Sequence, residues 1–230
     1  MRLPGVLLGV AAGAVLIVAA WTTGLVEPPE RVSRGLAVFT AVFPHPAGSA
    51  DVDRIPCPPL RRTRLYVVCT AGCEEVWKVM AVRGLGAATL ASLNRLPPEP
   101  IEERRERIAA AVARDDLQLD GAAAREMIGC YLRLEGLRPD LVLGPDHLRL
   151  LRTARGDEAA MRRLAESLED PAALDRLEVV REAGGFVARF LYWQTAEAGR
   201  PVLELEIRVG EDGVLRSLMA GLAALTDGAG

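Results

Sequence analysis

Several residue types are nearly missing from this 230-residue chain. It has one lysine, Lys78, one asparagine, Asn94, and two histidines, and aromatic residues make up only 4% of it. The 28 basic residues, all but one of them arginine, are matched by 31 acidic residues, which leaves a net charge of −3. Such a balance gives no basic excess to attract nucleic acid. We therefore expect no nucleic-acid partner.

The scarcity of histidine and of aromatic residues also narrows the possible chemistry. A Ser-His-Asp arrangement would have to recruit His45 or His147, and the sequence holds no Gly-x-Ser-x-Gly, His-Glu-x-x-His or Walker motif. The acid pair Asp115-Asp116 falls at a predicted helix end, where capping explains it. A glycosidase cleft would also need aromatic platforms. The sequence therefore predicts no catalytic residue and no cofactor, and it favours binding or assembly over catalysis.

Charge is absent from the beginning of the chain. Residues 3–26 contain no charged side chain, and as a helix they would span about 36 Å, against about 30 Å for the hydrocarbon core of a bilayer. The stretch also fits a cleavable signal peptide, with small residues at 18–20 as the cleavage site. We favour an uncleaved transmembrane anchor over residues 1–26, because the apolar run continues through Trp21.

The side of the membrane on which the C-terminal part lies is predicted from charge and cysteine content. The positive-inside rule does not fix the orientation, because Arg2 precedes the anchor while Arg31 and Arg34 follow it. Four cysteines, an even number that suits an oxidising compartment, favour export. We therefore predict a single-pass protein of the cell membrane whose C-terminal part is extracytoplasmic, either periplasmic or extracellular. A cytoplasm-facing adaptor with four reduced thiols is the alternative.

Proline marks the segment that follows the anchor. Residues 27–63 contain seven prolines and are predicted to form an extended tether. Within it, the apolar stretch 36–43 is too short to cross a bilayer, so it would pack on the domain or lie on the bilayer surface. Residues 64–220 are predicted to form one globular domain, and residues 221–230 a flexible tail.

Helical patterns dominate the first half of the predicted domain. A strand at 64–68 is followed by helices that are predicted at about 74–83, at 87–96, after Pro100, after Asp120, at 146–155 and at 157–168. The helix after Asp120 has the clearest signals, because Asp120 is a favoured N-cap residue and Gly136 stands just past the expected end. We expect this helix to belong to the core.

After residue 176 the helical period gives way to alternation. Gly184-Gly185 indicates a two-residue hairpin between strands at 176–182 and 186–195, and strands at 202–209 and 214–219 complete a four-stranded antiparallel meander. The fold class is therefore predicted to be α+β, with a helix-rich region packed on this meander. Such sheets often curl and leave an apolar pocket, as in cystatin-like or nuclear-transport-factor-like folds.

Cys69 and Cys73 are the most specific candidates for chemistry, because a thiol at a helix N-terminus is stabilised as the thiolate. In spacing the pair is similar to the copper-binding loop of Sco-type assembly proteins, a resemblance that makes His147 the candidate third ligand. The structural interpretation is that Cys57, Cys69, Cys73 and Cys130 form two disulfides, for example Cys73 with Cys130, in a pairing that the sequence leaves open. Buried thiols or a zinc site made by the four cysteines are further alternatives.

These features together predict a membrane-anchored extracytoplasmic binding or assembly domain of the cell envelope, stabilised by disulfides. Its partner would be another envelope protein or a small apolar ligand held under the meander. The alternative function is that of a thiol-redox or copper-handling envelope protein that uses Cys69 and Cys73, with no other metal or cofactor site expected.

Overall fold

The chain divides into two compact units. The computed structural model describes residues 17–21, 26–42, 50–70, 77–93, 98–147, 149, 173–193 and 202–222. The units are Met1–Asp115 and Asp116–Gly230, where we expected a single domain over residues 64–220. Each unit combines helices with an antiparallel sheet, so the α+β class is confirmed.

Most of the predicted anchor, at residues 1–16 and 22–25, lies outside the described residues, as does the predicted helix at 157–168. Residues 17–21 are helical. Within the part of the chain that the structure describes, no helix has both the length and the apolar character needed to cross a membrane. The anchor therefore stays a prediction.

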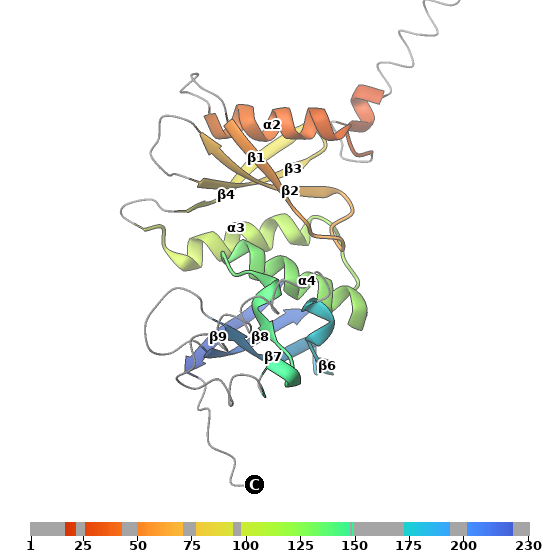
Figure 1. Ribbon diagram of the computed structural model, residues 1–230. Coiled ribbons are helices and arrows are strands. Elements are labelled where there is room, and N and C mark those ends of the chain that lie inside the picture. The colour runs from red at the N-terminus through yellow and green to blue at the C-terminus, as the bar shows by residue number, and fades with distance from the viewer. Residues whose placement is uncertain are drawn as a thin grey trace, which may run out of the picture. The chain divides into compact units, whose positions relative to one another are not determined.

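The first unit is built on a four-stranded antiparallel sheet between two helices. Its strands run in the order β1 (Ala50–Ile55), β2 (Thr63–Thr70), β3 (Trp77–Arg83) and β4 (Gly86–Leu93). Helix α2 (Glu30–Val42) lies across one face of this sheet, and α3 (Ile101–Ala113) lies along the other (Figure 1). The apolar core under α2 contains Ala37, Ala41, Tyr66, Val68, Met80 and Val82.

Residues 27–63 are therefore not an extended tether, because they contain α2 and β1. The prolines flank these elements instead of interrupting them. Pro28 and Pro29 stand just before α2, where the fixed φ of proline suits a helix start, and no proline lies between residues 30 and 42. The described part of the apolar stretch 36–43 packs on the sheet through Ala37 and Ala41, which confirms packing on the domain for its inner face.

Both ends of α2 are fixed to the sheet. At its start, Arg64 Nη1 donates hydrogen bonds to the Pro28 carbonyl oxygen at 2.8 Å and to Ser33 Oγ at 3.0 Å, and Arg64 Nη2 bonds Glu27 at 2.6 Å. At its end, Lys78 donates to a carbonyl oxygen of the last turn. The helix is therefore part of the folded unit.

The helices expected at 74–83 and 87–96 are wrong over the residues described, because β3 and β4 occupy them. Val79, Met80, Ala81 and Val82 are four consecutive buried residues of β3, since α2 and α3 cover the two faces of the sheet. A strand that is buried on both faces loses the polar alternation that identifies strands in a sequence.

The second unit confirms the clearest predicted helix. Helix α4 spans Gly121–Leu134, and the Asp120 carboxylate accepts a hydrogen bond from the Ala123 N–H at 2.8 Å, as an N-cap should. Gly136 follows the helix with a φ of +76°, a conformation that favours glycine. Eight residues of α4 are buried, so it is the core helix of this unit.

The C-terminal meander is also confirmed. Strands β6 (Val179–Glu182), β7 (Gly185–Trp193), β8 (Val202–Gly210) and β9 (Leu215–Leu222) pair in sequence order, and a short β5 (Val142–Leu143) adds to β7. The hydroxyl of Tyr131 on α4 donates to the Gly213 carbonyl oxygen at 2.9 Å and accepts from the Leu215 N–H at 3.0 Å. These two bonds fix the turn between β8 and β9 to the helix.

Candidate anion-binding cavity

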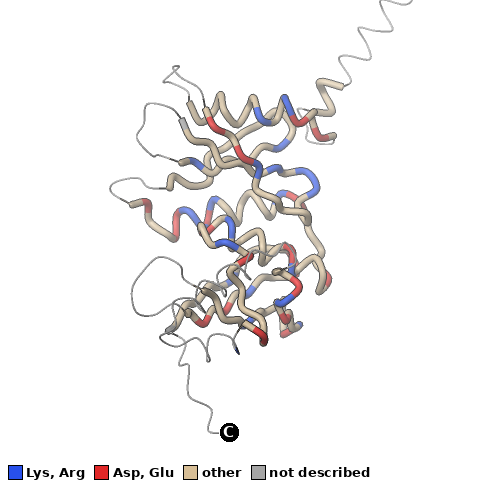
Figure 2. Tube along the Cα trace, viewed as in Figure 1, with Lys and Arg blue, Asp and Glu red and all other residues tan. Residues whose placement is uncertain are grey.

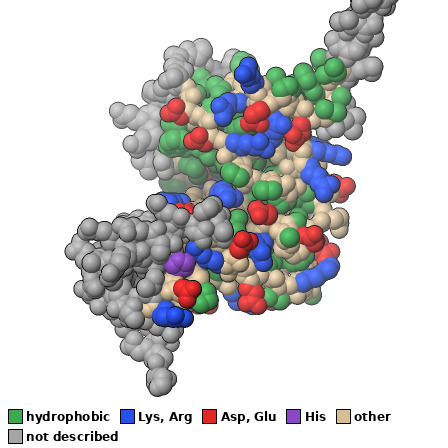
Figure 3. All heavy atoms as spheres, turned by 45° about the vertical axis from the view of Figure 1, so that its right-hand side comes forward, with side chains coloured by type: hydrophobic (Ala, Val, Ile, Leu, Met, Phe, Trp, Pro, Cys, Tyr) green, Lys and Arg blue, Asp and Glu red, His purple; other side chains and the backbone are tan. Residues whose placement is uncertain are grey.

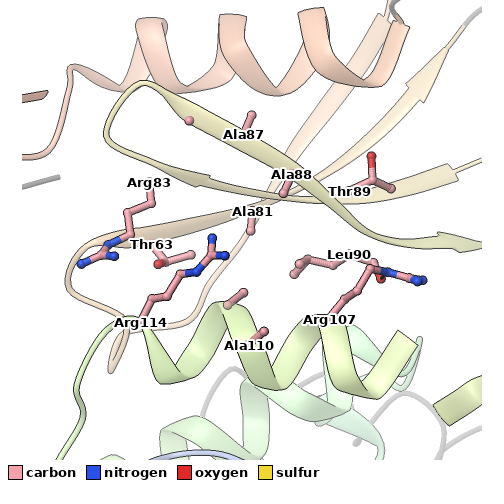
Figure 4. Close-up of a pocket in the computed structure, with 12 residues that line it drawn as sticks. Thr63, Ala81, Arg83, Ala87, Ala88, Thr89, Leu90, Arg107, Ala110 and Arg114 are labelled. Carbon is pink, nitrogen blue, oxygen red and sulfur yellow. Dashed lines mark hydrogen bonds between the residues drawn. The ribbon is translucent and has the colours of Figure 1, made fainter. Parts of the chain in front are cut away.

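A cavity of about 430 Å³ opens in the first unit between the sheet and α3. Figure 4 shows the β3–β4 hairpin on one side of this space and α3 on the other. The residues that line it are Thr63, Ala81, Arg83, Gly86, Ala87, Ala88, Thr89, Leu90, Arg107, Ala110, Ala111 and Arg114. We call this space the α3 cavity.

Small side chains explain why this space is not filled. Half of the lining residues are alanine or glycine, contributed by β3, by β4 and by one face of α3. Protein interiors are normally packed as densely as organic crystals. A void remains where short side chains on one element face short side chains on the other. A methyl group at Gly86 would meet only the Arg83 carbonyl oxygen, at an ordinary 3.5 Å, so the backbone does not require glycine there.

Three guanidinium groups give the cavity its charge. Arg83, Arg107 and Arg114 line it, and no aspartate or glutamate does. Basic and acidic residues are interspersed over much of the described chain, but a basic stretch is also present at residues 61–64 (Figure 2). The cavity wall itself carries positive charge, and its apolar part strengthens the effect of that charge on a bound anion.

Arg107 is held in place at the edge of the sheet. Its Nε donates to the Leu90 carbonyl oxygen at 3.0 Å, and its Nη2 pairs with Glu99. The Glu99 carboxylate in turn accepts from the Ser92 N–H at 3.1 Å. This pair satisfies backbone groups on the outer edge of β4, which would otherwise remain open to another strand. Arg107 therefore has a structural role as well as a place in the wall.

Unlike Arg107, Arg83 and Arg114 bind no other group of the protein through their side chains within the described part of the chain. Among the residues that the structure describes, neither side chain has a hydrogen-bond or ion-pair partner, and Arg83 Nε is buried without an acceptor. Figure 4 shows Arg83 extending from the hairpin and Arg114 extending from the end of α3 toward the sheet. A buried donor without an acceptor is costly, so an anion between these elements would satisfy a group that the chain itself leaves unpaired.

The carboxylate nearest in sequence to Arg114, that of Asp115, already accepts hydrogen bonds from the start of β2. Asp115 accepts from the Thr63 hydroxyl at 2.6 Å and from the N–H groups of Arg62 at 2.9 Å and Thr63 at 3.3 Å. Its side chain therefore fixes the start of β2, and the capping role expected for Asp115-Asp116 is wrong for Asp115. Asp116 adopts a φ of +52°, which aspartate tolerates better than most residues.

The cysteines divide into a bonded pair and a free thiol. Cys57 and Cys130 are joined by a disulfide, which confirms a structural crosslink in a pairing that the sequence left open and rules out Cys73 as the partner of Cys130. Cys69 is a half-buried free thiol near the end of β2, and Cys73 lies outside the described residues. The expected set of two disulfides is therefore wrong at Cys69, and a zinc site made by four thiols is incompatible with the bonded pair.

Of the three candidate copper ligands, Cys69 and His147 are among the described residues and Cys73 is not. Cys73 lies outside the described residues, and the helix expected to stabilise the thiolates is replaced by β3 over residues 77–83. His147 lies in a helical turn that begins at Pro145, and its Nδ1 accepts from the Gly144 N–H at 3.1 Å. Across the described ranges, no three His, Cys, Asp or Glu side chains gather as metal ligands would.

Sequence reasoning did not identify the α3 cavity. Its three arginines lie on different elements and are separated by 24 and 7 positions in a chain with 27 arginines, so no spacing pattern marks them. The only sequence feature that marks the cavity is the small residues at 86–88 and 110–111, which is a weak signal. Family models, curated proteins and solved structures all give no match to the chain. A function must therefore be inferred from the cavity itself.

Proposed function

We propose that this chain is a membrane-anchored, extracytoplasmic binding protein whose first unit holds a small organic anion in the α3 cavity. The ligand class is a carboxylate or a phosphate monoester with an apolar body. The observation that carries this proposal is the lining itself, which contains three arginines and no acidic residue.

The chemistry of the wall supports this ligand class. A guanidinium offers a planar fork of N–H donors that matches the oxygens of a carboxylate or phosphate, and such charge-assisted bonds are stronger than neutral ones. Ala81, Ala88 and Leu90 present methyl groups beside these forks. A cavity of this volume accommodates a small organic molecule, and burial of its apolar body adds to the affinity. The sequence predicted either an envelope protein or a small apolar ligand as partner. The cavity favours a small ligand, and its arginines favour one that carries a negative charge.

The proposed location depends on sequence and on one covalent bond. Residues 3–26 are uncharged over a length sufficient to cross a bilayer. The disulfide between Cys57 and Cys130 supports export, because disulfides persist in oxidising compartments and are rare in the cytosol.

Calorimetric titration of the full chain in lipid nanodiscs tests the binding role, with empty nanodiscs as the blank. Hexyl phosphate and hexanoate are the anionic probes, and hexylammonium is the control of opposite charge. We expect the anions to bind and hexylammonium not to bind. The double variant Arg83→Gln/Arg114→Gln should lose about tenfold or more in affinity, since each charge-assisted bond contributes about 1.5–3 kcal/mol.

Arg31→Gln/Arg34→Gln is the matched control for charge, because it also removes two arginines and both are exposed on α2, on the opposite face of the sheet. It should leave the affinity unchanged. Equal losses in the two double variants would show that the probe responds to net charge and not to the cavity. Equal binding of hexylammonium would refute an anion site.

A second candidate function follows from the cysteines. Because Cys57 and Cys130 are bonded to each other, Cys69 and Cys73 remain as the pair available for thiol-redox or copper chemistry, and Cys69 is a free thiol. Competition for copper(I) against a chromophoric chelator tests this alternative. Binding that Cys69→Ser/Cys73→Ser abolishes would support it, and equal chelator competition by both proteins would exclude it.

A further inference from the structure

From Gly35 to Val42, helix α2 carries no charge on the face that packs against the sheet or on the face that is turned away from it. Ser33, Ala37 and Ala41 are buried on the inner face. From residue 35 to residue 42 the helix has no charged side chain, and Phe39 is 65% exposed. A helix on the water-facing surface of a protein normally carries polar residues on its outer face. The second half of α2 does not fit that rule, because its exposed side chain is Phe39.

Other exposed hydrophobic residues lie in the same part of the chain. Ile17, Val18 and Val26 are 52%, 48% and 53% exposed. Figure 3 shows hydrophobic side chains gathered at the surface of the first unit, at the end where the described N-terminal residues lie. These residues belong to, or directly follow, the uncharged stretch 3–26. The apolar character of that stretch therefore continues onto the surface of the folded unit.

The connection between this stretch and α2 is short and fixed. Only residues 27–29 separate Val26 from the first residue of α2, and Arg64 holds them through Glu27 and the Pro28 carbonyl oxygen. Before them, the Trp21 carbonyl oxygen accepts from the Leu85 N–H at 3.2 Å, in the β3–β4 turn. A bilayer that receives residues 3–26 would therefore lie close to α2.

We infer that the outer face of α2 lies in the interfacial layer of the bilayer, with Phe39 directed toward the acyl chains. This inference rests on the membrane anchoring in the proposed function. An apolar helical face flanked by basic residues is the pattern of helices that bind at a membrane surface. Arg31 and Arg34, both exposed on the first half of α2, would meet the phosphates of anionic lipids.

Lipid contact at position 39 can be measured directly. A polarity-sensitive dye is attached at Phe39→Cys in the full chain, in a Cys69→Ser/Cys73→Ser background that keeps the disulfide. The matched control is the same dye at Ala113→Cys, an exposed position on α3 in the same unit. Both proteins are reconstituted into vesicles of phosphatidylcholine and phosphatidylglycerol that carry bromine on the acyl chains. We expect severalfold stronger quenching at position 39 than at position 113.

The possible failures are distinguishable. Equal, weak quenching at both positions in a protein that floats with the vesicles would overturn the inference for α2 and leave the anchor standing. A protein that does not float would overturn both the anchor and the inference. A blue-shifted dye at position 39 that brominated lipid does not quench would show that protein, and not lipid, covers this face.

Discussion

The ε-ammonium group of Lys78 donates a hydrogen bond to the carbonyl oxygen of Ala41 at 2.6 Å. The only lysine of the chain thus lies at the C-terminal end of α2, where helix carbonyl groups lack partners and the helix dipole favours a cation. Lys78→Met should lower the free energy of unfolding by about 1–2 kcal/mol. Lys78→Arg can still donate and should lose less. Denaturant unfolding of the full chain in mild detergent checks this, and equal stability of Lys78→Met and the parent would contradict it.

Arg64 should matter more than Arg54, although both pair with Glu30. The Arg64 side chain is 14% exposed and the Arg54 side chain 54%. Burial lowers the pKa of Arg64, but Glu27 and Glu30 outweigh this effect and raise it above its ordinary value. We expect Arg64→Met to cost about 2 kcal/mol or more, because it leaves buried acceptors unpaired. Arg54→Met, an exposed pair, should cost at most about 0.5 kcal/mol. Similar unfolding midpoints for the two variants would contradict a larger stabilising role for Arg64.

All three tyrosines should resist ionisation in the folded chain. Burial, assisted by a hydrogen bond to Glu30, raises the pKa of Tyr66 to about 12. Burial also raises the pKa of Tyr131 and of Tyr192. An unfolded tyrosine has a pKa of about 10. The native state therefore holds these protons more tightly, and the resulting stability, present below pH about 10, is lost as the pH rises toward 12.

Tyrosinate absorbance measures this effect. The native chain should show little tyrosinate at pH about 10, whereas the chain in denaturant should be about half ionised there. Tyr66→Phe should reduce the loss of stability between pH about 10 and 12. Superimposable titration curves for the native and denatured chains would contradict the buried placement of the three phenols.

The bond between Cys57 and Cys130 closes a long loop, since 73 positions separate the two residues. In the chain-entropy model a crosslink of this span stabilises the folded state by about 4 kcal/mol. Cys57→Ala/Cys130→Ala should therefore unfold at markedly lower denaturant concentration, while Cys69→Ala, which breaks no crosslink, should change stability far less. Peptide mapping without reduction should recover the two cysteines in one linked fragment. A fragment that links Cys69 to either of them would refute the pairing.

The sequence predicted best where one face of an element meets water. Strand β8 has this arrangement: Leu205 and Ile207 are buried, whereas Glu206 and Arg208 pair with each other on the outer face. The burial period of 2 residues was therefore visible in the residue pattern. The cap at Asp120 was visible for a similar reason, because its chemistry is local.

The prediction failed where tertiary contacts override local preference. The alanine-rich segment 86–93 has helical propensity but forms the edge strand β4, because it completes a sheet that α3 covers. Helix α2 was missed because prolines on both sides suggested an extended chain. The α3 cavity could not be predicted, since Arg83 and Arg114 line one space only when the hairpin and α3 pack on each other.

Filling the α3 cavity tests the central claim most directly. Ala110 and Ala113 are both exposed on α3, but only Ala110 lines the cavity. Leucine suits a helix at either position, so both variants should fold. We predict that Ala110→Leu weakens the binding of hexyl phosphate at least tenfold in calorimetric titration, whereas Ala113→Leu binds like the parent chain. If both variants bind hexyl phosphate with the parent's affinity, the cavity is not the binding site.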